Sequence, residues 1–420
     1  MREPDVVPTA PVLDLTPQDL DGIVDDLRAY HAIFSPLFQR REQRAWAETY
    51  LHGLLLDIPR KSIEPMVLHL HGADRNAVRA VQQFVGASAW DDRPILQQLW
   101  REVAADLGDA EGVLVVDGSD FPKQGKESVG VKRQYCGELG KTANCQAGVF
   151  LAYASVHGYA LLDRRLYLPQ DWFGDASAER RAACGVPDDV SFTTKPMLAL
   201  AMIQDVVAAG ALPCQWVAGD EAFGDCPALL DGIAALGKWY FAEVAHTTRV
   251  WRERPATAVP AWSGRGRKPT KLQVVPDAAP ALTVADVAAG LAPTAWQRHT
   301  IKEGCQGPLV ADFAFVRVVA VRDGLPGPDV WLVLRRSVTD GDLKAFLSNA
   351  PADIAVARLV RVSGMRWPIE TCFEVGKQAL GMGDYEVRSW RGWHHHMTLV
   401  LLAMGFLVRL QGRFEKTLPR

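Results

Sequence analysis

Residues 112–117, Gly-Val-Leu-Val-Val-Asp, decide the fold class that this 420-residue chain is expected to adopt. The short β-branched run predicts a buried strand. Residues 1–110, before it, carry apolar residues at helical spacing without strand-like alternation. Residues 129–135, 146–155 and 159–168, after it, are separated by turns that contain Gly, and they predict a meander of antiparallel strands. We therefore expect a helical domain followed by a sheet that begins at this strand.

The order of elements after the meander indicates a mixed sheet. We expect a helix over 195–209, a strand over 214–218 and another helix over 226–236. Antiparallel strands followed by helix, strand and helix form the order of a ribonuclease-H-like layer, which is a mixed sheet covered by helices. The expected fold class is therefore α/β (α+β), with a ribonuclease-H-like core, an N-terminal helical domain and a β-rich insertion.

The insertion is expected between residues 238 and 336. Further strands are predicted over 239–244, 271–275, 312–321 and 330–335. Residues 263–271, Ser-Gly-Arg-Gly-Arg-Lys-Pro-Thr-Lys, have little to bury and predict a loop. Helical character returns from Asp340 to about Leu380, and a last apolar helix is expected from Trp390 to about Leu410. The predicted domains are residues 1–110, the helical N-terminal domain; 111–237, the first part of the core; 238–336, the insertion; and 337–420, the second part of the core with the C-terminal helices.

Positive charge is segregated along the chain. The net charge of −3 does not by itself indicate a nucleic-acid partner. Lys and Arg nevertheless concentrate in residues 121–141, 249–271 and 388–420, and an acidic first thirty residues offset them in the total. These three segments are the places where an anionic polymer would bind.

Composition describes an ordinary soluble globular protein, with 48% hydrophobic and 23% charged residues. Seven scattered cysteines without a C-x-x-C pair argue against a disulfide framework or a zinc ribbon and favour a reducing cytosol. The acidic start argues against a signal peptide. The apolar run from Met397 to Leu407 is too short to span a bilayer and predicts a buried helix. We expect a cytoplasmic protein without a membrane partner.

Three carboxylates occupy positions that suit metal-assisted chemistry. Asp117 and Asp220 each end an apolar run, and Glu370 lies in a helical stretch between Arg366 and Lys377. Carboxylates from two strand ends and a helix can hold two Mg²⁺ ions about 3.5–4 Å apart, which serves in-line displacement at a phosphodiester. An isolated Asp after a strand is more often only a turn former. The local alternatives are Asp120, Glu221, Asp225 and Glu374.

Seven blocks of sequence occur in a fixed order and carry a family resemblance. They are 117–125 (DGSDFPKQG), 128–137 (SVGVKRQYCG), 144–154 (NCQAGVFLAYA), 166–169 (LYLP), 220–224 (DEAFG), 366–370 (RWPIE) and 383–388 (GDYEVR). Together they resemble the signature blocks of IS701-type DDE transposases, insertion-sequence enzymes related to the IS4-like group, over about residues 110–410.

The resemblance implies a catalytic site and its partners. Asp117, Asp220 and Glu370 would be the DDE triad and the ligands of two Mg²⁺ ions, with Mn²⁺ as a substitute and no small-molecule cofactor. Arg366 and Lys377 match the R-x₃-E-x₆-K part of a related signature, whose Tyr position is here Ser363. Asp120 stands where Gly is expected. The partners would be double-stranded DNA, as element ends and target, bound by a homodimer. A regulator without catalysis and a nuclease that only hydrolyses are the alternatives.

Several basic residues are predicted to contact DNA, and the N-terminal helices are predicted to read it. The loop at 263–271 is expected to lie along phosphates rather than bases, because flexible Gly-rich segments suit backbone contacts. Trp262 and Trp296 could stack on an unpaired base. The run His394-His-His396 cannot converge on one metal from a helix and is expected near DNA or solvent. The predicted DNA contacts are Lys123, Lys126, Lys132, Arg133, Arg265, Arg267, Lys268, Lys271, Arg388 and Arg391.

Overall fold

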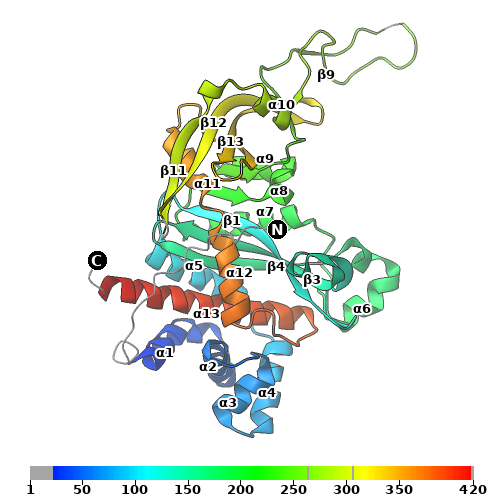
Figure 1. Cartoon of the computed structure of the whole chain (residues 1–420). Helices are drawn as coiled ribbons and strands as arrows, with labels where there is room; N and C mark the ends of the chain where they lie inside the picture. The colour runs from blue at the N-terminus through cyan, green and yellow to red at the C-terminus, as the bar shows by residue number, and fades with distance from the viewer. Residues whose placement is uncertain (1–21, 263, 305–306, 418–420) are drawn as a thin grey trace. The chain divides into compact units, whose positions relative to one another are not determined.

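A computed structural model describes residues 22–262, 264–304 and 307–417 (Figure 1). The chain forms two compact parts. Among the described residues, the central part is Gln215–Arg366, and the flanking part consists of the segments on either side, 22–214 and 367–417. The division into four domains predicted from the sequence stays a prediction.

The flanking part begins with α-helices. They are α1 (Ile23–Phe34), α2 (Arg41–Leu55), α3 (Ile63–His71), α4 (Arg75–Gly86) and α5 (Arg93–Leu107). Helix α4 starts where the Asp74 side chain accepts hydrogen bonds from the amides of Asn76 and Ala77, which are unpaired within the helix. Apolar side chains at helical spacing, Leu51 and Leu54 of α2 among them, are fully buried. All five helices lie within residues 1–110, for which helical character was predicted.

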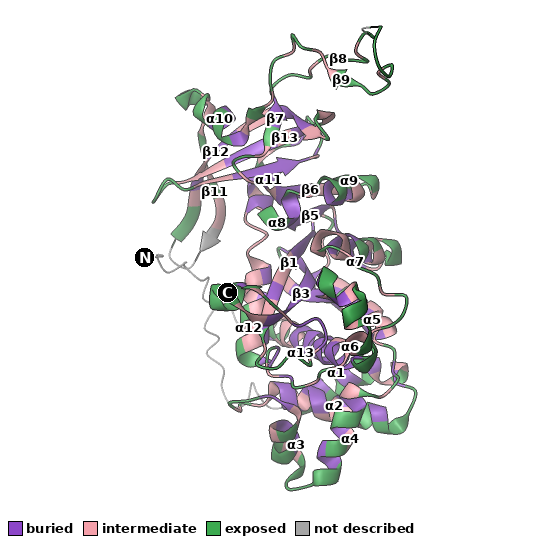
Figure 2. Ribbon diagram, turned by 90° about the vertical axis from the view of Figure 1, so that its right-hand side faces the viewer, coloured by how far each residue is buried: buried purple, intermediate pink, exposed green. Residues whose placement is uncertain are grey.

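A β-meander follows in the same part. Strand β1 (Val113–Pro122) pairs antiparallel with β3 (Lys141–Ser155), which also pairs with β2 (Lys132–Cys136) and with β4 (Gly158–Tyr167). The apolar run Val113–Val116 is buried, as are residues 145–155 of β3, and Figure 2 shows much of both strands in the colour of buried residues. Short helix α6 (Ala178–Ala183) and the longer α7 (Lys195–Ala209) come next, and α7 packs on β1, β3 and β4.

Helix α13 (Trp390–Thr417) is the core helix of the flanking part, packed against α2, α4, α5 and β4. The stretch Trp390–Phe414 is long and apolar enough to cross a membrane by length and composition, but 67% of its most apolar 18 residues are buried inside the structure. The helix is also longer than the run on which the sequence prediction rested. Burial within the protein accounts for its apolar character.

The central part contains a parallel pair followed by antiparallel strands. Strand β5 (Trp216–Gly219) pairs parallel with β6 (Trp239–Glu243), and α8 (Glu221–Gly224) and α9 (Pro227–Ala235) connect them. Strands β14 (Leu343–Ser348), β13 (Leu325–Ser337) and β12 (Gly307–Arg322) continue from β6. The remaining elements are β7 (Arg249–Trp251), β10 (Leu282–Thr283) and β11 (Gln297–Gly304) in the same sheet, β8 (Thr257–Ala258) paired with β9 (Gln273–Val274), and helices α10 (Val284–Ala289) and α11 (Val356–Ser363).

The predicted fold class is confirmed. The flanking part supplies an antiparallel meander and the central part a parallel β–α–β unit, which are the strand directions of a ribonuclease-H-like mixed sheet. One local prediction was wrong, because helical character does not return at Asp340. Residues 343–348 instead form β14, which pairs with β13 and β6. This short apolar segment has no clear helical or strand period, so its conformation is set by pairing with strands distant in sequence.

Candidate functional site

Asp117 lies within β1, where it pairs with Phe150 of β3. The sequence placed it at the strand end, but β1 continues to Pro122. One Asp117 carboxylate oxygen accepts a hydrogen bond of 2.7 Å from the Gly118 amide. The buried run before it fixes the strand, so the side chain projects from a rigid backbone.

The local competitor, Asp120, points to the other face of β1. Successive side chains of a strand alternate between faces, and β1 pairs with β3 without a register shift, so positions 117 and 120 differ in face. Asp120 accepts a hydrogen bond of 2.7 Å from the Gly137 amide and so holds the β2–β3 connection. The structure therefore separates a structural carboxylate at Asp120 from the candidate at Asp117.

Glu370 sits in the first turn of helix α12 (Pro368–Ala379), which contacts β1 and β4. The buried residues Ile369 and Cys372 fix the rotation of the helix. Its competitor Glu374 is exposed and lies 3.5 Å from the Gln378 amide nitrogen. Glu370 is half-buried on a helix whose packing is set by its neighbours.

Lys377 lies further along α12 and reaches β1. Its amine is 5.7 Å from the centre of the Phe121 ring and forms an ion pair with Glu138. Phe121 is four residues after Asp117 and shares its face of β1. The predicted Lys377 is thus on the same strand face as Asp117, although Glu138 balances its charge.

Asp220 directly follows β5 and caps helix α8. Its carboxylate accepts hydrogen bonds from the amides of Ala222 (3.1 Å) and Phe223 (3.3 Å). Burial raises the pKa of the carboxyl and Glu243 adds to the rise, whereas Arg366 and the two amides lower it. Asp220 is therefore a desolvated carboxylate held beside a guanidinium.

Glu243, at the end of β6, is a residue that the sequence analysis missed. Its carboxylate lies 3.3 Å from the Lys344 amine and 3.9 Å from Nε of Arg366. A Cβ on Gly224 would come within 1.8 Å of the Glu243 carbonyl oxygen, so a glycine is needed for α8 to lie against β6. Glu243 ends an apolar run just as Asp220 does, and that pattern could have identified it.

Glu221 and Asp225, the alternatives to Asp220 as a metal ligand, differ from it in contacts and exposure. Asp225 accepts hydrogen bonds from the Thr248 hydroxyl (3.0 Å) and the Ala245 amide (3.4 Å), which holds the segment after β6. Glu221 is exposed in the first turn of α8. Asp220 is the member of this acidic group that is fixed at the strand tip.

The five predicted catalytic residues are divided between the parts. Asp117, Glu370 and Lys377 belong to the flanking part, and Asp220 and Arg366 to the central part. Over the residues that the structure describes, no group of three or more His, Cys, Asp or Glu side chains is close enough to hold a metal ion. The donors themselves fit, because carboxylate oxygens are the ligands that Mg²⁺ and Mn²⁺ prefer.

The predicted DNA contacts differ in how available their charge is. Lys126, Arg133 and Arg388 are exposed, as are Arg265, Arg267, Lys268 and Lys271. Lys132 forms an ion pair of 2.5 Å with Asp171, and Arg391 donates to the Ala87 carbonyl at 2.9 Å.

Lys123, which was predicted to contact DNA, has its amine turned inward in the structure. Its amine donates to the Tyr385 carbonyl (3.2 Å) and lies 3.4 Å above the ring of the same residue. Burial lowers the pKa of this amine to about 8. A cation over an aromatic ring contributes to packing, and the DNA contact of Lys123 stays a prediction.

The run His394-His-His396 was expected near DNA or solvent, but His395 and His396 lie in the core. The His395 ring stacks on Trp90 at 3.5 Å between ring centres. Nδ1 of His396 is 2.8 Å from the Tyr50 hydroxyl. Burial lowers the pKa of His396 to about 3. The side chains are enclosed because α13 is covered around most of its circumference.

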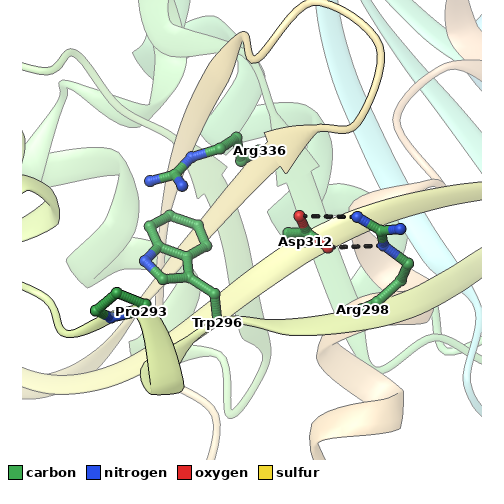
Figure 3. Close-up of a pocket in the computed structure, with 5 residues that line it drawn as sticks. All are labelled: Pro293, Trp296, Arg298, Asp312 and Arg336. Carbon is green, nitrogen blue, oxygen red and sulfur yellow. Dashed lines mark hydrogen bonds and ion pairs between the residues drawn. The ribbon is translucent and has the colours of Figure 1, made fainter.

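Trp296 lines an open pocket of about 460 Å³ in the central part (Figure 3). The Arg336 guanidinium lies 3.8 Å over the indole ring, and Arg298 donates two hydrogen bonds, of 2.9 and 3.2 Å, to Asp312. One ring face of Trp296 is therefore already covered by a cation. Stacking of a base on Trp296 or Trp262 stays a prediction.

Comparison with known proteins identifies one family. The model of the family described as "DDE superfamily endonuclease" matches residues 33–308, more than half of the chain. The match includes Asp117 and Asp220, and Glu370 lies beyond it. A search of curated proteins returned no significant match. Among solved structures, the cryo-EM structure of a piggyBac transposase synaptic complex with hairpin DNA aligns with a TM-score of 0.45 at 9% identity, covering 94% of this chain and 76% of that one.

Proposed function

Because this chain belongs to the DDE superfamily endonucleases, we propose that it is a transposase, which cleaves DNA at the ends of an insertion sequence and joins those ends to target DNA. The observation that carries the proposal is the family match across both strand carboxylates, Asp117 and Asp220. The resemblance to IS701-type transposases supports the finer assignment and adds Glu370 as the third carboxylate.

The triad would hold two Mg²⁺ ions through Asp117, Asp220 and Glu370, and Mn²⁺ would substitute. When bound, such ions stabilise the attacking and leaving oxygens of an in-line displacement at phosphorus. Each of the three carboxylates is fixed by its element, a strand interior, a strand tip and the first turn of a helix. Placement on regular elements suits a reaction that depends on alignment.

The basic residues near the triad support the carboxylates and the DNA. Arg366 favours the ionised form of Asp220 against burial, which keeps its oxygens available as ligands. Lys377 would hold a DNA phosphate in place of its present partner Glu138. Two element ends must be handled together, so a homodimer on double-stranded DNA is part of the proposal.

The test is a cleavage and joining assay with DNA taken from the sequence that flanks the coding region. We expect nicked and joined products with Mg²⁺ or Mn²⁺, and binding without chemistry with Ca²⁺. Asp117→Asn, Asp220→Asn and Glu370→Gln should each reduce both products by at least about 100-fold, as removal of a single electrostatic interaction with the transition state commonly does.

Matched controls come from the structural competitors Asp120→Asn and Glu374→Gln, which should retain cleavage. Full activity in a strong chelator would contradict the metal assignment. Nicks without joined products would indicate a nuclease that only hydrolyses. DNA binding without nicks by the wild-type chain would indicate a regulator.

A further inference from the structure

The β8–β9 hairpin, residues 257–274, presents a concentrated positive charge in the central part. Residues 255–276 contain no Asp or Glu. Arg265, Arg267, Lys268 and Lys271 are all exposed. Figures 1 and 2 show the hairpin extending away from the other strands of its part. This charge therefore faces solvent on a projecting element.

The hairpin has a defined frame at both ends. At its base Thr257 pairs with Val274 and Ala258 with Gln273. Nearer the tip, the half-exposed indole of Trp262 donates a hydrogen bond of 3.2 Å from Nε1 to the Gly266 carbonyl. A loop that reads base edges needs such a frame, whereas a loop that only follows phosphates does not.

The tip has a narrow backbone because glycine alternates with arginine. Gly264 has φ of 82° and Gly266 has φ of 73°, a left-handed conformation that other residues adopt at a penalty. The sequence Gly264-Arg-Gly-Arg267 thus presents two guanidinium groups from a chain with no side chain between them. A segment of this shape fits a groove about 6 Å wide, which is the width of the DNA minor groove.

We propose that the β8–β9 hairpin inserts Arg265 and Arg267 into the minor groove of A·T-rich duplex DNA. A·T tracts narrow this groove and strengthen its negative potential, which attracts arginine. A G·C pair instead places an amino group on the groove floor. The inference rests on the proposed function, which makes DNA the substrate, and it replaces the expectation that the whole loop contacts phosphates only. Lys268 and Lys271 keep that role.

The full chain tests the proposal in binding to three duplexes of equal length, built from A·T, G·C or inosine·cytosine pairs, measured by fluorescence anisotropy. An inosine·cytosine pair lacks the minor-groove amino group of G·C but keeps a G·C-like major groove. We expect similar affinity for the A·T and inosine·cytosine duplexes. Both should bind about fivefold or more tightly than the G·C duplex, the scale of a single base-pair preference.

Two double variants separate minor-groove reading from charge. Arg265→Lys with Arg267→Lys keeps the charge but should lose most of the preference, because lysine is more strongly hydrated than arginine. Lys268→Ala with Lys271→Ala removes charge next to the Arg-Gly-Arg tip. This second variant should bind all three duplexes more weakly by similar factors and keep the preference.

Three results would overturn the proposal: equal affinity for A·T and G·C duplexes, an inosine·cytosine duplex that behaves like G·C, or a preference that survives both arginine replacements. Each preparation is also assayed for Mg²⁺-dependent cleavage of element-end DNA. Cleavage without an A·T preference would overturn this inference alone. Failure of the wild-type chain to bind any duplex would overturn the proposed function as well.

Discussion

At Asp220, two neighbouring charges act in opposite directions on one half-buried carboxyl. Arg366 lowers the pKa of this carboxyl and Glu243 raises it. Burial also raises the pKa, and its effect is larger than that of either charge. The ionised form is the metal ligand, so the balance of these neighbours determines how readily Asp220 can bind a cation.

Removing either neighbour should therefore move the pKa of Asp220 in a known direction. In the metal-free protein, Arg366→Gln should raise it further, and Glu243→Gln should lower it, because each change deletes one of the opposing charges. Carbon-13 NMR titration of the labelled Asp220 carboxyl measures both shifts. Shifts of the same sign in the two variants would show that these charges do not act on Asp220.

The sequence could predict candidate catalytic residues, but it could not distinguish them from acidic residues a few positions away. Asp117 and Asp120 follow the same apolar run, and only the register of β1 on β3 shows that they face opposite ways. The hydrogen bond from Gly137 to Asp120 depends on a turn 17 residues away in sequence. The position of the Lys123 amine could not be predicted for the same reason, since its aromatic partner Tyr385 is distant in the chain.

At the scale of elements, Lys61 joins the ends of two helices. Its buried amine donates to the carbonyls of Leu54 in α2, at 2.9 Å, and of Ala379 at the end of α12. Its backbone amide donates to Asp384 at 2.8 Å. The first turn of α12 carries Glu370, so Lys61 ties the N-terminal helices to a candidate catalytic helix.

Lys61→Met should reduce the free energy of unfolding by about 1–3 kcal/mol, since it leaves buried carbonyls without a donor. Cleavage should fall with it through the altered position of α12. Urea unfolding measures the first effect. Arg60→Gln is the matched control, because Arg60 and Glu386 form an exposed ion pair and such pairs contribute about 0–1 kcal/mol. Equal stability of the two variants would show that Lys61 does not clamp the helices.

The buried histidines of α13 predict acid sensitivity. The pKa of His396 is about 3 in the folded protein against 6.5 ordinarily, so the unfolded chain binds the proton first as pH falls. The contribution of His396 to the free energy of unfolding is fully present above pH 6.5 and is lost as the pH falls toward 3. Between pH 7 and pH 5 the free energy of unfolding should fall by about 2 kcal/mol for this reason.

Urea unfolding of His396→Phe at pH 7 and pH 5 checks this expectation. The variant should be less stable at pH 7, because the Tyr50 hydroxyl loses its partner, but its stability should fall less on acidification. His157→Gln, at an exposed turn, should keep the wild-type pH dependence. An unchanged pH dependence in His396→Phe would place the acid sensitivity elsewhere.

Long helices were predicted better than short strands, and α7 was predicted to the residue from a continuous apolar segment of 15 residues. Short strands were not. Strands β7 and β10 span three residues and two residues, and β14 has no clear period, so their partners decide them. The sequence carries no local signal for such pairing.

At the scale of the whole molecule, the proposed DNA binding must overcome a net charge of −3. The basic residues are exposed in local groups, so affinity should depend on phosphate binding and fall with salt. Lys268→Ala with Lys271→Ala should make the slope of log affinity against log salt shallower by about 0.9 for each DNA phosphate that the variant no longer neutralises. Binding measured from low to high salt gives this slope, and an unchanged slope would show that these lysines face solvent in the complex.

The mixed α/β class could be predicted from the sequence, and the segregated charge pointed to nucleic acid. Sequence patterns could not show that the chain forms two parts with the candidate carboxylates divided between them. That division depends on packing across more than a hundred residues, such as that of α12 and α13 on elements before Cys214.

The most direct test of the central claim, that Asp117 is a metal ligand of a DDE site, is cleavage by Asp117→Cys with different ions. Thiolate ligands are accepted by Mn²⁺ more readily than by Mg²⁺. We predict activity at least about 100-fold below wild type with Mg²⁺ and substantial recovery with Mn²⁺, whereas Asp120→Cys should show no such dependence on the ion. Equal loss with both ions at position 117, together with an ion-dependent rescue at position 120, would contradict the account.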